Sequence, residues 1–274
     1  MGDVIVFRTQ DGQFEPLGVE ASTLDEATLQ LPHGAYSVFR LYPGRRVLRL
    51  DSHLDRMRRS ARLLGYPFPL SNDDLRAVAR GAVARAGWET PRVRLTVPFD
   101  APDTVLAMVE PWSPPPPVAY EQGVHVGLAC APRERPGAKD SRFVEARRAL
   151  WDGQQDCYEI LLHTADGCIL EGTGSNFYGV LGGELRTAGE GMLEGIARSL
   201  LLEVAPTVLP VRLDPICLGD LPHLEEAMLT SASRGVVPIV QIGDNIIGAG
   251  RPGPATARLH AAYDSRVEAE LEPL

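Results

Sequence analysis

The chain has 274 residues, of which 44% are hydrophobic and 23% are charged, and its formal net charge is −9. A chain of this length can bury a core and form one large or two modest domains. The excess of negative charge argues against nucleic acid or an anionic membrane surface as the main partner, since both would repel it.

Strands and two helices are predicted for the first part of the chain. Residues 35–42 and 47–50 are rich in β-forming side chains and flank the turn Pro43-Gly44, which predicts a hairpin. A helix capped by Asp51 or Ser52 follows and ends at Gly65. Its apolar face consists of Leu54, Met57, Ala61 and Leu64. The remaining expected elements are strands at 4–8, 16–20, 92–97 and 104–110 and a helix at 71–87 capped by Ser71.

The segment 111–119, PWSPPPPVA, is the clearest boundary in the sequence. Consecutive prolines favour an extended, semi-rigid connector. We therefore expect a small α+β domain at 1–115 and a larger α/β domain at 120–274, with 111–119 as the linker.

The second part again mixes helices and strands. We expect strands at 124–130, 157–163, 168–170, 175–181, 184–186 and 207–212 and a strand–loop–strand unit within 221–248. Helices are expected near 140–151, 195–204 and 254–271. The elements do not alternate strictly as βαβ units, so a doubly wound sheet is not expected and the fold class is α+β.

Cytoplasmic localisation is predicted from the N-terminus and the cysteines. The first residues, MGDVIVFRTQDG, lack the long apolar run of a signal peptide, and no run of about 18 apolar residues could span a membrane. The cysteines show neither a C-x-x-C pair nor zinc-binding spacing, so no metal site is expected. We expect buried free thiols in a reducing compartment at all four positions, Cys130, Cys157, Cys168 and Cys217.

One lysine stands out in the composition. Of the 27 basic residues only Lys139 is a lysine, and the other 26 are arginines. An arginine stays protonated near neutral pH, whereas a lysine amine becomes a nucleophile once its pKa is lowered. Position 139 is thus a candidate Schiff-base lysine, with chance survival of one surface lysine as the alternative.

Further residues could complete a site for a phosphorylated pyridine cofactor. Glu171, at the end of a return strand, could hold a pyridine nitrogen, and Asn176 could brace its loop. The predicted helix start at Gly195, Ile196 and Ala197 offers free N–H groups to a phosphate. Arg56 could bind the phosphate bidentately, and the loop 230–235 supplies hydroxyls. Each of these features alone also fits an ordinary turn, helix end or solvated face.

The order and spacing of these segments resemble the class IV aminotransferases, which are fold-type IV pyridoxal-phosphate enzymes. The motif H-x-x-R-(L/M)-x-x-S-A is matched at residues 53–61, and AKDSRFVEARRAL resembles the segment of the Schiff-base lysine. The string DGCILEGTGSNFYGV is similar to the block that carries the family glutamate. MLEGIARSLLLE and AMLTSASRGVVPIVQI resemble the two phosphate-binding segments.

The resemblance implies a two-domain enzyme with a small N-terminal domain and a larger pseudo-barrel domain. It implies that Lys139 carries pyridoxal 5'-phosphate and moves the proton, and that Glu171 holds the pyridine nitrogen. The phosphate would be bound by Arg56, the N–H groups of Ile196 and Ala197, and the loop Ser231, Ala232 and Ser233. Tyr36 and Arg40 would face the substrate, and a homodimer is implied. Two positions depart from the family pattern, since Ala197 and Ala232 stand where threonine is common.

The function expected from this resemblance is an aminotransferase. It would move an amino group from a branched-chain or D-amino acid to a 2-oxo acid by a ping-pong Schiff-base mechanism. One alternative is a lyase of the same fold, such as 4-amino-4-deoxychorismate lyase, and another is a non-catalytic binding protein that kept the fold. A lyase would release pyruvate without an added oxo acid, whereas a transaminase needs an acceptor.

Overall fold

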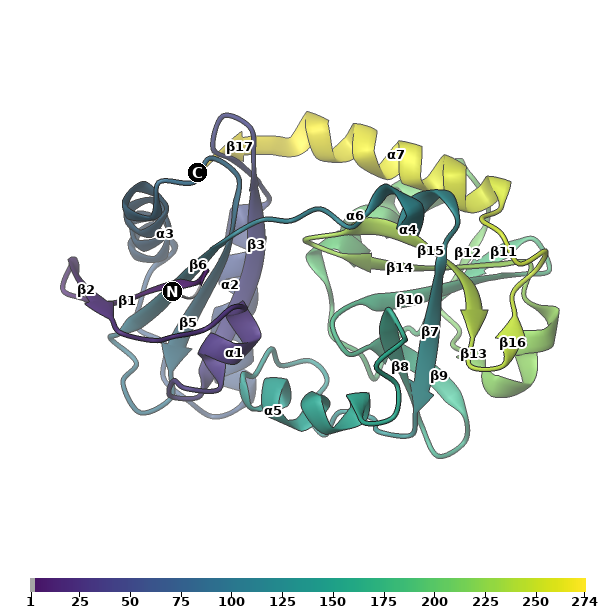
Figure 1. The fold of residues 1–274 in the computed structure, drawn as a ribbon, viewed down its shortest axis with the longest axis horizontal. Coiled ribbons are helices and arrows are strands. Elements are labelled where there is room, and N and C mark those ends of the chain that lie inside the picture. Colours follow the sequence, from purple (N-terminus) through teal and green to yellow (C-terminus); the bar gives the residue numbers. More distant parts are fainter. Residues whose placement is uncertain (1–2) are drawn as a thin grey trace. The chain divides into compact units, whose positions relative to one another are not determined.

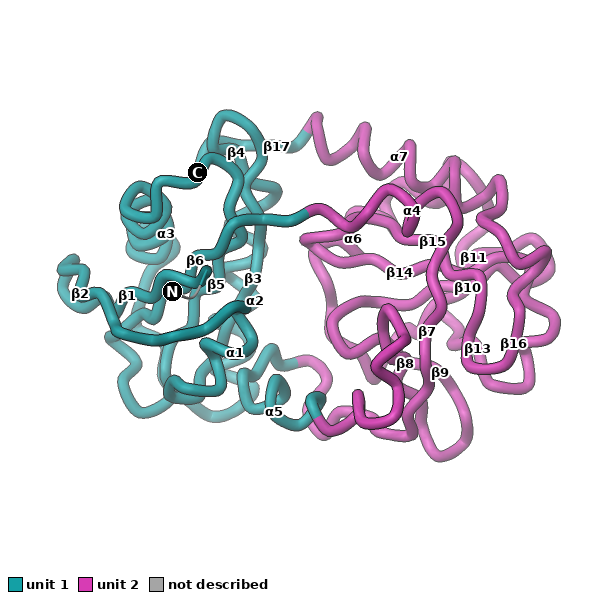
Figure 2. The backbone as a smooth tube through the Cα atoms, in the orientation of Figure 1, with its two compact units in different colours: residues 1–113, 138–148, 270–274 teal, residues 114–137, 149–269 magenta. Residues whose placement is uncertain are grey.

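The described residues, 3–274, divide into two units in the computed structural model (Figures 1 and 2). Unit 1 comprises 1–113, 138–148 and 270–274, and unit 2 comprises 114–137 and 149–269. The segment 138–148, which carries Lys139, therefore belongs to unit 1, although the sequence boundary near 115 assigns it to the second domain. Met1 and Gly2 of the expected first domain lie outside the described residues.

Unit 1 is built on one antiparallel sheet of seven strands (Figure 1). In sheet order the strands are β17 (Leu271–Pro273), β4 (Arg46–Leu48), β3 (Gly34–Tyr42), β5 (Pro91–Pro98), β6 (Val105–Pro111), β1 (Ile5–Gln10) and β2 (Gln13–Leu17). The helices of this unit are α1 (Leu24–Thr28), α2 (Leu50–Leu63), α3 (Asn72–Ala86) and α5 (Arg142–Arg148). The expected hairpin, the two long helices and the four flanking strands are all present, within a few residues.

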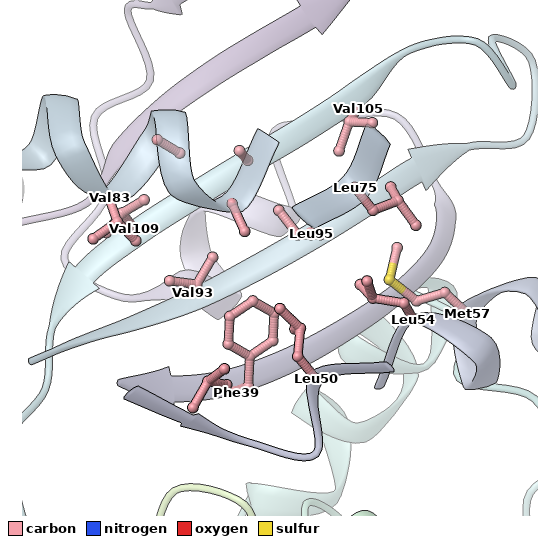
Figure 3. Packing of buried hydrophobic residues seen from close by; sticks show 14 of the residues in the cluster. Phe39, Leu50, Leu54, Met57, Leu75, Val83, Val93, Leu95, Val105 and Val109 are labelled. Atoms are coloured by element: carbon pink, nitrogen blue, oxygen red, sulfur yellow. The ribbon is translucent and has the colours of Figure 1, made fainter. Parts of the chain in front are cut away.

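The main core of unit 1 packs α2 and α3 onto one face of this sheet. Leu54 and Met57 of α2 and Leu75 of α3 are fully buried against strand residues such as Phe39 and Leu95 (Figure 3). The alternation along β3 explains the arrangement, because successive side chains of a strand point to opposite faces. Phe39 and Leu41 join this core, while Tyr36 and Arg40 lie on the other face.

The start of α2 differs from the sequence expectation. Its N-cap is Arg49, in a left-handed conformation with φ of 47°; the Arg49 side chain makes no capping bond, and the Glu272 carboxylate accepts from the N–H of Leu50 at 3.0 Å instead. Asp51 and Ser52 lie inside the first turn instead. The expected cap of α3 is confirmed, because the Ser71 side chain accepts from the N–H of Asp74 in a capping box.

Unit 2 is built on a larger, mixed sheet. Nine strands follow one another in the order β12 (Val211–Arg212), β11 (Glu184–Arg186), β10 (Asn176–Leu181), β14 (Glu226–Ser231), β15 (Gly235–Ile242), β7 (Val124–Ala129), β8 (Glu159–His163), β9 (Cys168–Gly172) and β13 (Ile216–Cys217). A short tenth strand, β16 (Asn245–Ile246), pairs with β15. The pairs β11–β12, β15–β7 and β7–β8 are parallel, and the others are antiparallel.

Helices of unit 2 include the two expected at 195–204 and 254–271, the end of the helical stretch expected near 140–151, and three short ones that the sequence misses. The helical elements are α4 (Pro117–Glu121), η1 (Ala149–Trp151), α6 (Ile196–Val204), η2 (Ala205–Thr207), η3 (Leu218–His223) and α7 (Pro254–Glu270). The extended connector expected at 111–119 is shorter than predicted, because α4 begins at Pro117 and proline is well tolerated in a first turn. The strand expected at 207–212 is reduced to two residues, since Pro206 lies in η2.

The cysteines correct a prediction. Cys168 of β9 and Cys217 of β13 face each other in the antiparallel register and form a disulfide. The other two are free, but Cys130 is exposed and Cys157 is partly exposed. The sequence contained no signal for the pairing, because the partners are 49 residues apart and only the strand register brings them together. Among residues 3–274, no helix is long and apolar enough to cross a membrane.

Candidate active site

The backbone around Lys139 is fixed on both sides by unit 1. The N–H of Lys139 donates to Ser60 Oγ of α2 at 2.9 Å, and its carbonyl accepts from the N–H of Tyr36 at 3.1 Å. The next residue, Asp140, forms an isolated bridge with Ala35 at the start of β3. These contacts hold the half-buried lysine beside β3 and α2, even though about a hundred residues separate the segments.

The Lys139 amine lies over the ring of Tyr36, with Nζ 4.7 Å from the ring centroid. Tyr36 is fully buried on β3, and the Arg94 guanidinium lies 4.8 Å from the same ring centre. Burial alone would raise the pKa of the Tyr36 phenol, but Lys139, Arg147 and Arg94 outweigh it and lower the pKa to about 8. Tyr36 and Lys139 are thus an electrostatically coupled pair.

Arg56 is buried on α2 and oriented by two polar neighbours. Its Nη2 donates to Ser37 Oγ at 3.0 Å, and the same oxygen lies 2.9 Å from His53 Nδ1. Burial, together with Arg56 and Lys139, holds the pKa of His53 well below its usual range, so the imidazole is neutral. Ser60 then links this group to the lysine, since its hydroxyl donates to the Arg56 carbonyl at 2.7 Å and accepts from Lys139.

Arg40 lies on the same face of β3 as Tyr36 but has a different environment. Its guanidinium is placed between two aromatic rings, 4.1 Å from the centre of Tyr42 and 4.0 Å from that of Trp112. Such stacking restrains the side chain. A direct substrate contact of Arg40 stays a prediction.

Glu171 of unit 2 is a buried carboxylate on β9. One oxygen accepts from the N–H of Leu193 at 3.1 Å, and the other lies 3.6 Å from Arg133 Nη1. Asn176, at the start of β10, binds the same residue, because its Nδ2 donates to the Leu193 carbonyl at 2.8 Å. Leu193 therefore joins the two predicted site residues, and the bracing role expected of Asn176 agrees with this contact.

The approach to α6 carries the predicted phosphate-binding N–H groups. Gly195 is the N-cap of α6 and, among the described residues, no side chain caps this helix end. A Cβ on Gly195 would collide with Asn176 Oδ1, so the backbone passes directly beside that side chain. Ile196 and Ala197 follow as the first helical residues. An uncapped helix N-terminus suits an anion such as a phosphate.

The loop after β14 is placed beside the same residues by strand register. Asn176 of β10 pairs with Thr230 of β14, so Ser231, Ala232 and Ser233 follow immediately next to the start of β10. The Ser231 hydroxyl accepts from Arg234 Nε at 3.0 Å. Its own hydrogen therefore remains to be donated to another acceptor.

The predicted site residues thus gather in two groups, one in each unit. Unit 1 brings together Lys139, Arg56 and Tyr36, and unit 2 brings together Glu171, Asn176, Gly195 and the loop 231–233. Sequence reasoning missed Ser37, which positions Arg56, and gave no role to His53 or Ser60. The sequence did contain an indication for His53 and Ser60, because their spacing from Arg56 places all three residues on one face of a helix.

A protein-family model and relatives of known name match most of this chain. The family model of amino-transferase class IV matches residues 34–242. A probable branched-chain-amino-acid aminotransferase of Thermotoga maritima is 30% identical over 255 residues, covering 88% of both chains. A D-alanine aminotransferase of Listeria monocytogenes is 26% identical over 268 residues, covering 88% of this chain and 89% of the relative.

Solved structures share the fold. A putative branched-chain amino acid aminotransferase structure from Thermotoga maritima has a TM-score of 0.79 and 28% identity, with 96% of each chain covered. A branched-chain amino acid aminotransferase from T.th., solved with pyridoxamine 5'-phosphate, has a TM-score of 0.82 and 21% identity, covering 98% of this chain and 97% of that one. The expected fold-type IV architecture is confirmed by these matches, and the chain belongs to the class IV aminotransferase family.

Proposed function

We propose that this class IV aminotransferase carries pyridoxal 5'-phosphate on Lys139 and transfers an amino group from an amino acid to a 2-oxo acid. The observation that supports this most is the placement of the single lysine. Its backbone is fixed by Ser60 and Tyr36, and its amine lies beside the Tyr36 ring. The side chains fit this cofactor, because the half-buried Lys139 is available for an aldehyde, the buried Arg56 for a phosphate and the buried Glu171 for a pyridine nitrogen.

Each end of the cofactor has matching groups. In unit 1, Lys139 Nζ would hold the aldehyde carbon and Arg56 is available for the phosphate; in unit 2, the N–H groups of Ile196 and Ala197 are available for the phosphate. Ser231 and Ser233 supply further donors, whereas Ala232 supplies only its backbone. Glu171 holds the pyridine nitrogen, and Leu193 and Asn176 keep its loop in place. When bound, the cofactor supplies the electron sink that stabilises a carbanion at the substrate Cα.

Proton movement is assigned to Lys139 Nζ. As a free amine, Lys139 Nζ would take the proton from the substrate Cα and would return it later in the transfer. Tyr36 lies against the amine and restricts its movement.

The substrate class and assembly belong to the same proposal. We expect a branched-chain or D-amino acid donor, because relatives with both names match most of the chain. We also expect a homodimer in the cytoplasm, with small molecules as its only partners. Tyr36 is assigned to the substrate side of the site, and Arg40 to its edge.

The test combines an absorbance scan with a donor panel. We expect a yellow band on addition of pyridoxal phosphate, and turnover of L-leucine, L-valine or D-alanine only when 2-oxoglutarate or pyruvate is present. Absence of the yellow band would contradict cofactor binding. Pyruvate release from aminodeoxychorismate without an acceptor would replace the aminotransferase by the lyase.

A further inference from the structure

A buried carboxylate of unit 2, Glu159, lies at the centre of a hydrogen-bond network outside the predicted site. It begins β8, and only 3% of its surface is exposed. Burial alone would raise the pKa of this carboxyl, but Arg234 and the hydrogen bonds around it prevail and lower the pKa, so the group is ionised. A buried charge is costly unless it is paired, and its partners show what it holds in place.

One set of partners belongs to the loop 173–175, which lies between Glu171 and Asn176. The hydroxyl of Thr173 donates to Glu159 Oε1, and that of Ser175 donates to Oε2 at 3.1 Å. A Cβ on Gly172 would lie 3.1 Å from Glu159 Cγ, so the chain after Glu171 passes in direct contact with this side chain. Glu159 thus fixes the loop that sets the positions of both residues.

The other partner belongs to the loop after β14. Arg234 Nη2 donates to Glu159 Oε2 at 2.8 Å and to the Gly174 carbonyl at 3.3 Å, while Arg234 Nε donates to Ser231 Oγ at 3.0 Å. The guanidinium therefore connects Glu159 and Gly174 to the hydroxyl predicted to bind phosphate. Because that oxygen accepts from Arg234, its hydrogen is directed elsewhere, toward an acceptor.

We infer that Glu159 and Arg234 are positioning residues that set the geometry of both loops of the cofactor site in unit 2. Arg234 aligns Ser231 as a phosphate donor, and Glu159 anchors Arg234 together with the loop 173–175. This inference rests on the proposed function, because it assigns the loops to the cofactor. It adds two residues that are not among the predicted ligand-binding residues, and Arg234 contacts one of those, Ser231.

The experiment compares two ligands in three variants of the full chain. Pyridoxal phosphate and pyridoxal, which lacks the phosphate, are titrated into Glu159→Gln and Arg234→Lys. Glu226→Gln is the matched control, because Glu226 accepts from the N–H groups of Ala255 and Thr256 at the opposite end of β14 from Ser231. Circular dichroism establishes that each variant is folded.

The two variants have different expected results. Removal of a group that orients a ligand-binding residue costs about ten-fold or more in affinity at metal sites, and a similar loss is expected here. Arg234→Lys keeps the charge but loses the fork that reaches Ser231. The Arg234→Lys variant should therefore bind pyridoxal phosphate more weakly than wild type does. Its affinity for pyridoxal should stay within about two-fold of wild type, which is the variation expected for a substitution at an independent site. Glu159→Gln should lower the affinity for both ligands, and Glu226→Gln should change the affinity for neither ligand.

The outcomes separate this inference from the proposed function. If wild type binds pyridoxal phosphate and both variants keep its affinity, the positioning role is overturned and the function stands. An equal loss in Glu226→Gln would also overturn it, since the effect would then be general destabilisation. If Glu159→Gln does not fold, Arg234→Lys decides by its selectivity for the phosphate. A wild type that binds no pyridoxal phosphate ends both proposals.

Discussion

The two units hold their predicted site residues by different means. In unit 1, the Ser37 hydroxyl joins the side chains of Arg56 and His53, and the Ser60 hydroxyl accepts from the backbone N–H of Lys139. In unit 2, carboxylate and amide side chains hold backbone, as Glu171 and Asn176 do with Leu193. A network of side chains can be weakened one member at a time, whereas a backbone scaffold depends on the whole sheet. Substitutions of Lys139 and Arg56 in unit 1 should act on chemistry and cofactor binding, whereas loss of the Cys168–Cys217 bond in unit 2 should act on stability.

The largest effect is expected at the lysine. Lys139→Arg should reduce turnover at least about 10⁴-fold, because it removes covalent attachment and also proton transfer, which alone contributes about 10²–10⁴-fold. Steady-state assays with the best donor measure the loss, and circular dichroism should show an unchanged fold. Partial rescue of Lys139→Ala by a small primary amine would sharpen the assignment. Retained turnover in Lys139→Arg would remove the lysine from the mechanism.

A large effect on stability is expected in unit 2. Cys168→Ser breaks the disulfide to Cys217, which closes a loop of 49 residues. Loop-closure entropy gives an upper estimate of about 4 kcal/mol for such a bond. Denaturant unfolding should show the loss, and reductant should destabilise wild type but not the variant. Cys157→Ser, at a free cysteine, is the control. Two titratable thiols in the native protein would support the bond, and four would contradict it.

A smaller effect is expected at the phosphate arginine of unit 1. Arg56→Ala should lower the affinity for pyridoxal phosphate about ten-fold or more, because a hydrogen bond to a charged group contributes about 1.5–3 kcal/mol. Pyridoxal, which lacks the phosphate, should bind the variant and wild type alike. Arg62→Ala, near the C-terminal end of the same helix, serves as the control for a general loss of positive charge. Equal affinity for pyridoxal phosphate would show that Arg56 has no role in binding.

The smallest effect concerns His53 and pH. Its folded pKa lies well below its unfolded value near 6.5, so below pH 6.5 the unfolded chain binds a proton that the folded chain does not. Stability should therefore fall as the pH drops from 6.5 toward 5, by at most about 1.4 kcal/mol per pH unit. His53→Asn should flatten this slope, and the exposed His33→Asn should not. A slope unchanged in His53→Asn would refute the assignment.

Local patterns were sufficient for much of the fold. The hairpin at 34–48 and the capped helix α3 follow from alternation, turn residues and the Ser71 capping box. The start of α2 was misplaced because a left-handed Arg49 leaves no trace in residue type. The disulfide and the Glu159–Arg234 pair were missed for another reason: their members are 49 and 75 residues apart and meet only in the folded sheet.

In the candidate site, too, features marked by local sequence could be predicted and features that depend on distant contacts could not. Lys139, Arg56 and Glu171 could be proposed as site residues because each has a chemical type and a motif that mark it. Their supporting residues were not, since a serine such as Ser37 has many ordinary uses and acquires a role only beside His53 and Arg56. Direct ligand groups are thus easier to predict from a sequence than the residues that hold them.

Neither unit is a continuous stretch of chain, because 138–148 and 270–274 return to unit 1 from unit 2. During synthesis, strand β4 stays unpaired on one side until β17 is made, because β17 lies more than two hundred residues later in the sequence. A fragment cut at residue 113 would lack Lys139, the proposed catalytic amine, and would expose the β4 edge to other chains. Gene fusions and split-protein reporters should therefore use surface loops within a unit, such as the turn at Gly182–Gly183, rather than the proline-rich segment that looks like a natural cutting point.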